Sequence, residues 1–169
     1  RNVSNFLKME LDAVKNGDAV KIIALEKTFE RELNHPNLPF PVLIKGNVDR
    51  IELRNGRIRI IDYKTGKVEK ANVVLKSWNG LTQELKNDKI IQVLAYAFMF
   101  ENEAGDIPME VGIISFKNLK SGFLPFSFKE DKELNLTVTN EILKNYLEEI
   151  VLLLNEILDV IIPFEEKIN

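Results

Sequence analysis

Three residues that could together hold a divalent metal and cut a phosphodiester lie between positions 46 and 66, in the segment GNVDRIELRNGRIRIIDYKTG: Asp49, Asp62 and Lys64. Carboxylate oxygens suit Mg²⁺ or Mn²⁺, which keep several waters and also bind substrate phosphate. An ammonium group beside such an ion can orient or deprotonate water, or neutralise the charge that builds on phosphoryl oxygens. The three residue types therefore predict metal-dependent hydrolysis of a phosphate ester.

Two strands of a hairpin must position these side chains. Residues 42–54 and 57–63 alternate, or nearly alternate, apolar and polar side chains. Between them, Asn55-Gly56 is the strongest short signal for a two-residue hairpin turn. We therefore expect the two runs to pair antiparallel.

In that register Asp49 lies opposite Asp62. Opposed carboxylates are unfavourable in a sheet, and a cation between them resolves the repulsion. Side chains alternate along a strand, so Lys64 points to the same side as Asp62 while Tyr63 points to the other. An ordinary solvated, charged hairpin remains the alternative.

A third element carries Gln92 and Tyr96, in the run KIIQVLAYAFMF. Residues 81–103 predict a helix whose apolar second half packs against the sheet. The two polar side chains are one turn apart on one stripe and project together. They form either a satisfied polar pair in the core or one wall of an active site.

The motifs GNVDRI, IIDYKTGK and QVLAYA resemble the PD-(D/E)XK nuclease superfamily. They are most similar to its RecB-like branch, the nuclease domain at the C-terminal end of RecB- and AddAB-type helicase-nucleases. That branch has G-x-x-D-R, a turn, D-Y-K-T-G and a helix with Q-x-x-x-Y, in this order. The resemblance covers roughly residues 20 to 120 and implies a restriction-endonuclease-like core.

The resemblance implies a role for each matching residue. Asp49 and Asp62 would ligate metal, the Tyr63 carbonyl would complete the set, and Lys64 would be the catalytic lysine. Gln92 would line the site and help to place the lysine or the DNA strand, as would its motif partner Tyr96.

Relatives also carry an acidic residue on a strand before the hairpin. Glu26, in the run IIALEKTF, matches that position as a further metal ligand, and Glu30 is the competing choice.

The implied activity is that of a Mg²⁺- or Mn²⁺-dependent DNA exonuclease, acting with a helicase domain or subunit in recombination and repair. A DNA-binding or scaffold module that keeps this fold without cutting is the alternative. A phosphohydrolase for small substrates is a weaker option, and the chain has no Gly-rich phosphate loop.

The chain departs from the branch in one respect. Relatives usually carry a histidine on a helix upstream of the hairpin, and this chain has none at such a position. The one histidine here, His35, lies in the proline-rich run NHPNLPFP, which predicts a turn or extended connector. The chain also has no cysteine, so it has neither a disulfide nor a thiol metal site. Because the chain begins with Arg1 and closes soon after a long helix, we expect it to be part of a longer protein. The histidine, and the iron–sulfur cluster of many relatives, would then belong only to the full-length protein.

Length and composition predict one compact domain over residues 1–169, with 45% hydrophobic residues. No run is long and apolar enough to cross a bilayer, which predicts a soluble, cytoplasmic protein without a membrane partner.

The net charge of −3 is unevenly distributed. Residues 45–76 contain nine basic and four acidic side chains, a net of +5, which leaves −8 for the remainder. A basic stripe near the metal site predicts sequence-independent phosphate contacts. Its members are Arg50, Arg54, Arg57, Arg59, Lys67, Lys70 and Lys76.

The remaining pattern predicts an α+β fold in which a central mixed β-sheet is flanked by α-helices. Helices are expected over 2–16 and 140–160, and strands over 19–33, 110–117 and 123–129. The first helix presents Phe6, Leu7, Leu11 and Val14 as its expected core stripe, and the last extends its stripe from Ile142 to Ile157.

Overall fold

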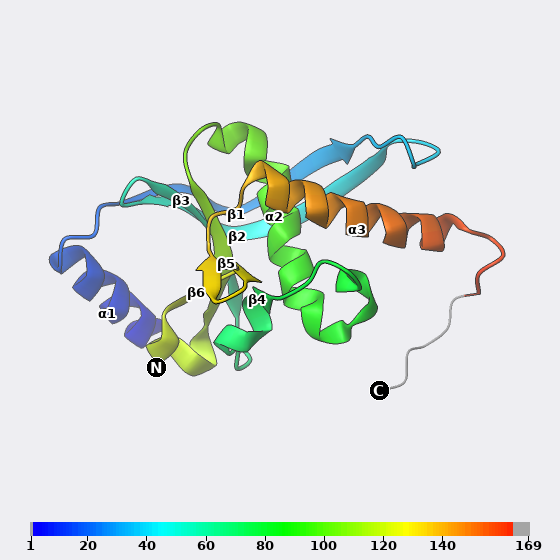
Figure 1. Cartoon of the computed structure of the whole chain (residues 1–169). Coiled ribbons are helices and arrows are strands. Elements are labelled where there is room, and N and C mark those ends of the chain that lie inside the picture. Colours follow the sequence, from blue (N-terminus) through cyan, green and yellow to red (C-terminus); the bar gives the residue numbers. More distant parts are fainter. Residues whose placement is uncertain (1, 164–169) are drawn as a thin grey trace.

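A mixed five-stranded sheet in the order β1-β2-β3-β5-β6 forms the centre of the molecule (Figure 1). The computed structural model describes residues 2–163. The strands of this sheet are β1 (Val20–Leu33), β2 (Val42–Arg54), β3 (Arg57–Lys64), β5 (Met109–Ser115) and β6 (Phe123–Pro125). A second sheet has the order β4-β7-β8 and consists of β4 (Val74–Leu75), β7 (Ser127–Glu130) and β8 (Glu133–Asn135).

Three α-helices flank the main sheet: α1 (Asn2–Lys15), α2 (Asp88–Ala104) and α3 (Asn140–Leu158). Helix α2 packs along the main sheet, and α3 packs against α2. Helix α1 lies on the other side of the sheet from α2 (Figure 1). Four short 3-10 helices complete the connections: η1 (Lys70–Val73), η2 (Leu81–Gln83), η3 (Leu85–Asn87) and η4 (Phe116–Ser121). The expected α+β architecture with a mixed, helix-flanked sheet is confirmed.

The β2–β3 hairpin has the expected register. Arg54 pairs with Arg57, so Asn55 and Gly56 are the two turn residues. Their φ values of 51° and 79° are both positive, as a type I′ turn requires. The Asn55 side chain also accepts a hydrogen bond from the Ala19 backbone N–H at 2.9 Å, which ties the turn to the start of β1.

Strand β3 pairs parallel with β5, and the crossover between them includes α2. This connection brings the end of the hairpin and α2 together although they are far apart in the chain. Gly112 in β5 permits the approach of β6, because a Cβ atom there would lie 2.2 Å from the Leu124 carbonyl oxygen. Strands β5 and β6 thus approach each other at a distance that only glycine allows.

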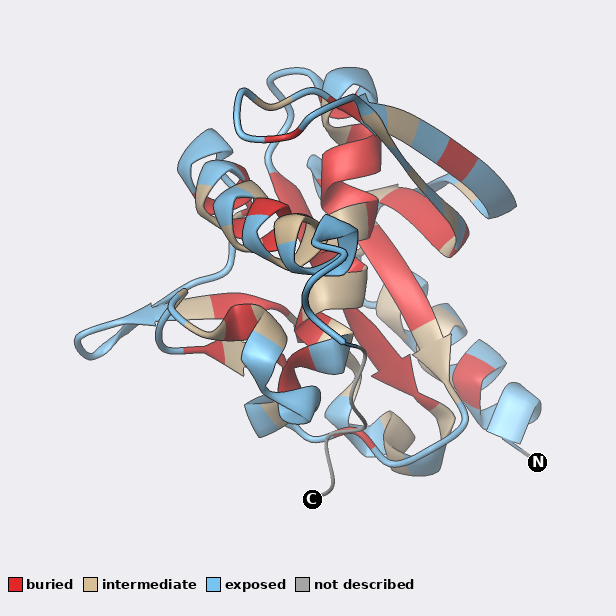
Figure 2. Cartoon of the chain, turned by 90° about the vertical axis from the view of Figure 1, so that its right-hand side faces the viewer, coloured by how far each residue is buried: buried red, intermediate tan, exposed pale blue. Residues whose placement is uncertain are grey.

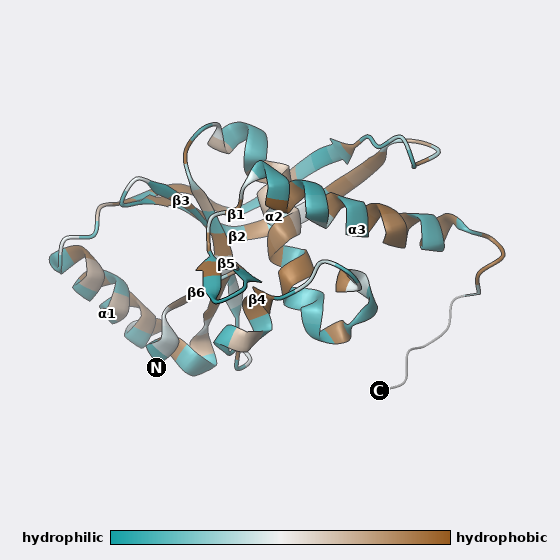
Figure 3. Ribbon diagram, in the orientation of Figure 1, coloured by the Kyte–Doolittle hydropathy of each residue, from teal (hydrophilic) through white to brown (hydrophobic). Residues whose placement is uncertain are grey.

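The core lies between the sheet and the pair α2 and α3, where buried residues of the helices and strands meet (Figure 2). The hydropathy pattern follows the same division, with apolar segments on the inner side of α2 and α3 (Figure 3). Trp78 packs onto this core and stacks on Phe128 with 5.2 Å between ring centroids. Full burial of such apolar side chains contributes about 1.5–3 kcal/mol each to the hydrophobic stabilisation.

The opposite face of the sheet carries a buried polar cluster. Arg54 donates to Glu52 at 2.7 Å, to Asp18 at 2.8 Å and to Glu10 of α1 at 2.7 Å. Arg50 donates to the same Glu10 carboxylate at 2.8 Å and also pairs with Glu52. Burial alone would lower the pKa of Arg54, but its hydrogen bonds to Glu52 and Asp18 raise it overall. The cluster therefore holds α1 against the sheet through charge.

Three sequence expectations need correction. The α1 stripe is wrong beyond Phe6, because Leu7, Leu11 and Val14 are at least half exposed and the ion pairs to Glu10 fix a different face of the helix against the sheet. The helix expected over 81–103 begins only at Asp88, since η2 and η3 occupy the residues before it. At the end of the stripe in α3, Ile157 is exposed because the helix runs beyond the core.

None of the helices within residues 2–163 is both long and apolar enough to cross a lipid bilayer.

We expect Arg54→Met to lower the free energy of unfolding by about 3 kcal/mol, since it leaves buried carboxylates with fewer cationic partners. This loss lies at the low end of the range of about 3–5 kcal/mol for breaking a buried ion pair, because Arg50 still contacts Glu52. Chemical denaturation monitored by circular dichroism measures the change. The exposed Lys21 provides the control, and Lys21→Ala should change stability by less than about 0.5 kcal/mol. Equal stabilities of the two variants would contradict a structural role for the cluster.

Candidate active site

Asp49 lies where strand β2 changes the side that it presents to the core. Val48 and Ile51 both belong to the core under α2 although they are three residues apart, while Arg50 points to the α1 side. Strict alternation therefore fails at Asp49. One of its carboxylate oxygens accepts a hydrogen bond from the Tyr63 backbone N–H at 2.7 Å. This bond fastens the carboxylate to the end of β3, one residue beyond Asp62.

Asp62 lies on β3 and is buried, with 3% of its surface exposed. Burial raises the pKa of this carboxyl, and the nearby Asp49 charge acts in the same direction. The Lys64 ammonium opposes the shift, with Nζ 2.9 Å from Asp62 Oδ2. This contact is an ion pair without hydrogen-bond geometry, because Oδ2 accepts no well-directed hydrogen bond within the described chain. A buried carboxylate oxygen is thus left for a stronger cationic partner.

Lys64 is linked from β3 to α2 through Gln92. Its Nζ donates to Gln92 Oε1 at 2.7 Å, and Gln92 Nε2 donates to the Tyr96 hydroxyl at 2.8 Å. Tyr96 also lies close enough to Asp62 for the two groups to interact electrostatically, and we call the four side chains together the closed polar ring. Burial raises the pKa of Tyr96, so its hydroxyl stays protonated at neutral pH. The polar pair on α2 therefore faces Lys64 and Asp62 of β3.

Gly46 explains how the Tyr96 ring reaches this position. A Cβ atom at Gly46 would lie 3.1 Å from both Tyr96 Cε1 and Met99 Cε. Contacts that close are tighter than ordinary van der Waals contacts. Gly46, the glycine of GNVDRI, therefore lets the Tyr96 ring lie directly on the backbone of β2.

Tyr63 points to the opposite face, as alternation predicts. Its ring packs edge-on against Phe6 of α1 with a centroid distance of 5.5 Å. Its hydroxyl accepts a hydrogen bond from Arg50 at 3.3 Å. The side chain is therefore structural, and only the Tyr63 backbone lies beside the candidate site.

Ser115 is a positioning residue that the sequence analysis missed. It is fully buried beside Lys64 in the parallel β3–β5 ladder. Its hydroxyl donates to the Gly66 carbonyl at 2.7 Å and accepts from the Asn118 backbone N–H at 3.2 Å. The loop after Lys64 is thereby fixed to the end of β5. No local signal in the sequence distinguishes this serine, since the contact depends on the parallel pairing.

The two acidic candidates on β1 have different surroundings. Glu26 lies between the ladder pairs Leu25–Arg50 and Lys27–Val48, which places it opposite Asp49. Its φ of 44° is in the left-handed region, which costs on the order of 1 kcal/mol or more for a residue other than glycine. Both strands are therefore irregular at the same point of the sheet.

Glu30, by contrast, pairs with Lys45 across the ladder and lies 3.6 Å from its ammonium. Lys45 is four residues from Asp49 along β2, or about 13 Å at the usual strand rise of ~3.3 Å per residue. Glu30 is thus excluded as a neighbour of Asp49.

The donor chemistry fits a hard divalent cation. Within residues 2–163 no three acidic, imidazole or thiol side chains are grouped as a metal cluster. Two neighbouring carboxylates, Asp49 and Asp62, suit Mg²⁺, which is commonly bound through one or two carboxylates with waters and phosphate filling the other positions. The buried Asp62 Oδ2 without a directed hydrogen bond supports the same fit.

The predicted basic stripe is largely wrong as a phosphate surface. Arg50 and Arg54 are buried in the ion-pair cluster on the α1 face. Arg59 donates to Glu110 at 3.1 Å, and Arg57 lies 3.6 Å from the same carboxylate. These four arginines are neutralised because acidic residues outside 45–76 fold onto them. His35 likewise lies away from the site, 3.5 Å from Glu148 of α3.

The family comparison agrees with this geometry. The family model described as the PD-(D/E)XK nuclease superfamily matches residues 3–167. The chain belongs to this superfamily. No curated protein matches the chain. The sheet with α2 against it is consistent with the restriction-endonuclease-like fold of PD-(D/E)XK proteins.

In this chain Asp62 and Lys64 lie together on β3, and the Tyr63 backbone N–H holds the Asp49 carboxylate of β2 beside them. Membership supports a nuclease-type domain, a nucleic-acid substrate and a divalent metal ion, without fixing which ion.

We expect Asp62→Asn to raise the melting temperature in EDTA at neutral pH. The pKa of Asp62 is raised, so its favourable contribution is present below the unfolded-state pKa and is lost as pH rises through the folded-state pKa. At neutral pH the buried charge therefore destabilises the fold, and each ~1 kcal/mol recovered corresponds to about 2–4 °C. Asp106→Asn, at an exposed carboxyl, serves as the control. A lower melting temperature for Asp62→Asn would contradict the burial argument.

Proposed function

We propose that residues 1–169 are one nuclease domain that hydrolyses DNA phosphodiester bonds with Mg²⁺ or Mn²⁺. The observation that carries this proposal is the link from Lys64 to both Asp62 and Gln92. An ammonium held between a buried carboxylate and a helix amide has a fixed position. Such fixed groups are what stabilises charge that develops during phosphoryl transfer.

Asp49, Asp62 and the Tyr63 carbonyl would hold the metal ion, with Glu26 as a further ligand from β1. The bound ion would supply Lewis-acid activation of water and neutralisation of phosphate charge. Lys64 would orient the attacking water or neutralise the equatorial phosphoryl oxygens. Water adds to phosphorus, the bond to the leaving oxygen breaks, and that oxygen takes up a proton.

Gln92 and Tyr96 act as positioning residues in this proposal. The Tyr96 hydroxyl accepts a hydrogen bond from the Gln92 amide and lies beside Asp62. The amide oxygen of Gln92 is therefore turned toward Lys64. This arrangement holds the lysine close to the carboxylates rather than extended into solvent.

The finer proposal follows the RecB-like resemblance of the motifs. We infer an exonuclease that works with a helicase domain or subunit in DNA recombination and repair. Its support is the combination of G-x-x-D-R, D-Y-K-T-G and Q-x-x-x-Y in one chain. Further support comes from the hydrogen bonds that join residues of the three motifs, from Tyr63 to Asp49, from Lys64 to Gln92 and from Gln92 to Tyr96.

Cleavage of labelled linear single- and double-stranded DNA in Mg²⁺, Mn²⁺ or EDTA tests the proposal. We expect metal-dependent cutting that EDTA stops. The experiment should also use a longer form of the protein, extended at both ends, as a second sample. DNA binding by both forms without cutting by either would instead indicate a non-catalytic binding module.

Lys64→Ala should reduce cutting by at least about 10²-fold, since it removes one fixed charge beside the reacting phosphate. It should leave the rise in melting temperature on adding Mn²⁺ nearly intact, because every metal ligand is still present. Asp62→Ala should lose both the cutting and the Mn²⁺ effect. Lys67→Ala, at an exposed lysine paired with Glu69, is the matched control. An active Asp62→Ala protein would contradict the mechanism.

Glu26→Gln should weaken Mn²⁺ binding, and Glu30→Gln should not. Both side chains are exposed and lie on β1, but only Glu26 is opposite Asp49. The concentration of Mn²⁺ that gives half the rise in melting temperature measures the difference. Equal values for the two variants would remove Glu26 from the ligand set.

A further inference from the structure

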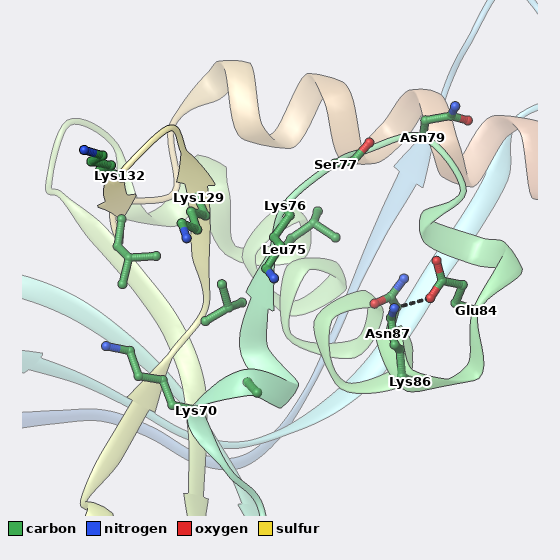
Figure 4. Close-up of a pocket in the computed structure, with 13 residues that line it drawn as sticks. Lys70, Leu75, Lys76, Ser77, Asn79, Glu84, Lys86, Asn87, Lys129 and Lys132 are labelled. Atoms are coloured by element: carbon green, nitrogen blue, oxygen red, sulfur yellow. Dashed lines mark ion pairs between the residues drawn. The ribbon is translucent and has the colours of Figure 1, made fainter.

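A cavity lined by lysines lies between the second sheet and the segment that leads into α2. Its volume is about 680 Å³. Five lysines and a single acidic residue line it (Figure 4): Lys70, Lys76, Lys86, Lys129, Lys132 and Glu84. The lysines come from three separate parts of the chain: the η1–β4 segment, η3 and the β7–β8 hairpin.

The positive charge of this cavity is mostly uncompensated. Glu84 pairs with Lys86. The ammonium groups of the other four lysines have no ion pair or hydrogen bond with any residue in 2–163. Like charges gathered around one hollow repel each other, and an anion placed among them relieves the repulsion. The arginines on the α1 face are paired with carboxylates, whereas these four lysines are not. The unpaired lysines therefore indicate a site for an external anion.

The position of the cavity connects it to the candidate active site by two routes. Lys64 and Lys70 are separated by one short loop, which Ser115 anchors at Gly66. Asn87, another lining residue, directly precedes α2. Gln92 follows five residues later, about 7.5 Å along the helix axis at ~1.5 Å per residue. In duplex DNA one strand has a phosphate every ~3.4 Å of helix axis, and phosphates of an extended single strand are farther apart, so a strand spans this distance within about two phosphates.

The lining chemistry favours a phosphodiester backbone over bases. No aromatic side chain lines the cavity. Trp78 is not among the lining residues, and its ring stacks on Phe128 and packs onto the core. Ammonium groups with polar Ser77 and Asn79 can bind phosphates irrespective of sequence.

We propose that this cavity binds the sugar–phosphate backbone of a single nucleic-acid strand whose scissile phosphate lies at Lys64. The inference rests on the proposed nuclease function and names the path of its substrate. The cavity has the volume of a cleft for a small ligand, so it can take one strand but not a duplex. The strand would run from the cavity past the first turn of α2 to the closed polar ring.

The first test measures binding of a fluorescein-labelled 15-nucleotide oligo(dT) in EDTA at several salt concentrations. Lys76→Ala/Lys129→Ala should lower the slope of log affinity against log salt by about 1.4, or ~0.7 for each phosphate that the protein no longer neutralises. Lys8→Ala/Lys144→Ala, at exposed lysines on α1 and α3, is the matched control and should keep the slope. Lys76→Glu/Lys129→Glu should weaken binding further.

The second test measures cutting of single-stranded DNA by the same variants in Mg²⁺. The cavity variant should raise KM and leave kcat unchanged, because it removes binding that ground state and transition state share. The rise in KM should vanish with DNA strands that are too short to reach from Lys64 to the cavity. Unchanged salt slope and KM in both cavity variants would overturn the proposal. Tripolyphosphate that binds through these lysines without displacing the oligonucleotide would overturn it as well.

The two proposals fail in distinguishable ways. If the wild-type protein cuts DNA through Lys64 while the cavity variants behave like wild type, only the strand path is wrong. If the wild-type protein does not cut DNA but the cavity variants lose DNA binding, the cavity still binds the nucleic-acid strand and only the nuclease function is wrong.

Discussion

The burial of one carboxylate, Asp62, constrains the rest of the site. The side chain lies on a central strand under α2, where its charged form is unfavourable and its pKa is raised. A charge in such a position needs a compensating cation. Lys64 supplies part of that compensation from two residues along the same strand. The remaining deficit is the physical argument for the metal ion that we propose beside Asp49.

The buried charged groups on the two faces of the sheet are paired in different ways. On the α1 face, ion pairs between buried arginines and carboxylates attach a helix whose apolar residues are largely exposed, although Arg50 Nε and Glu52 Oε2 make no directed hydrogen bond within the described residues. On the α2 face, the polar groups form a ring around an incompletely paired carboxylate. The first arrangement stabilises the fold, and the second retains a buried carboxylate whose charged form lowers stability. Asp49 lies where strand β2 passes between these two environments.

Basic residues close in sequence are divided among quite different roles. Arg50 and Arg54 hold α1, Arg59 pairs with Glu110, and Lys64 belongs to the polar ring. Lys70 and Lys76 line the cavity together with lysines from the β7–β8 hairpin. A count of charge in a segment therefore says little about where an anion binds, because tertiary neighbours decide which cations are left unpaired.

The sequence by itself determined the hairpin and its register, since Asn55-Gly56 permits the positive φ values of a two-residue turn. It also determined that Gln92 and Tyr96 share one helix face, because their spacing is one turn. Tertiary structure alone decided the change of side at Asp49, the anchoring of the Gly66 loop by Ser115 and the start of α2 at Asp88. It also decided which apolar face of α1 is buried. These features depend on partners distant in the chain, and local periodicity carries no information about such partners.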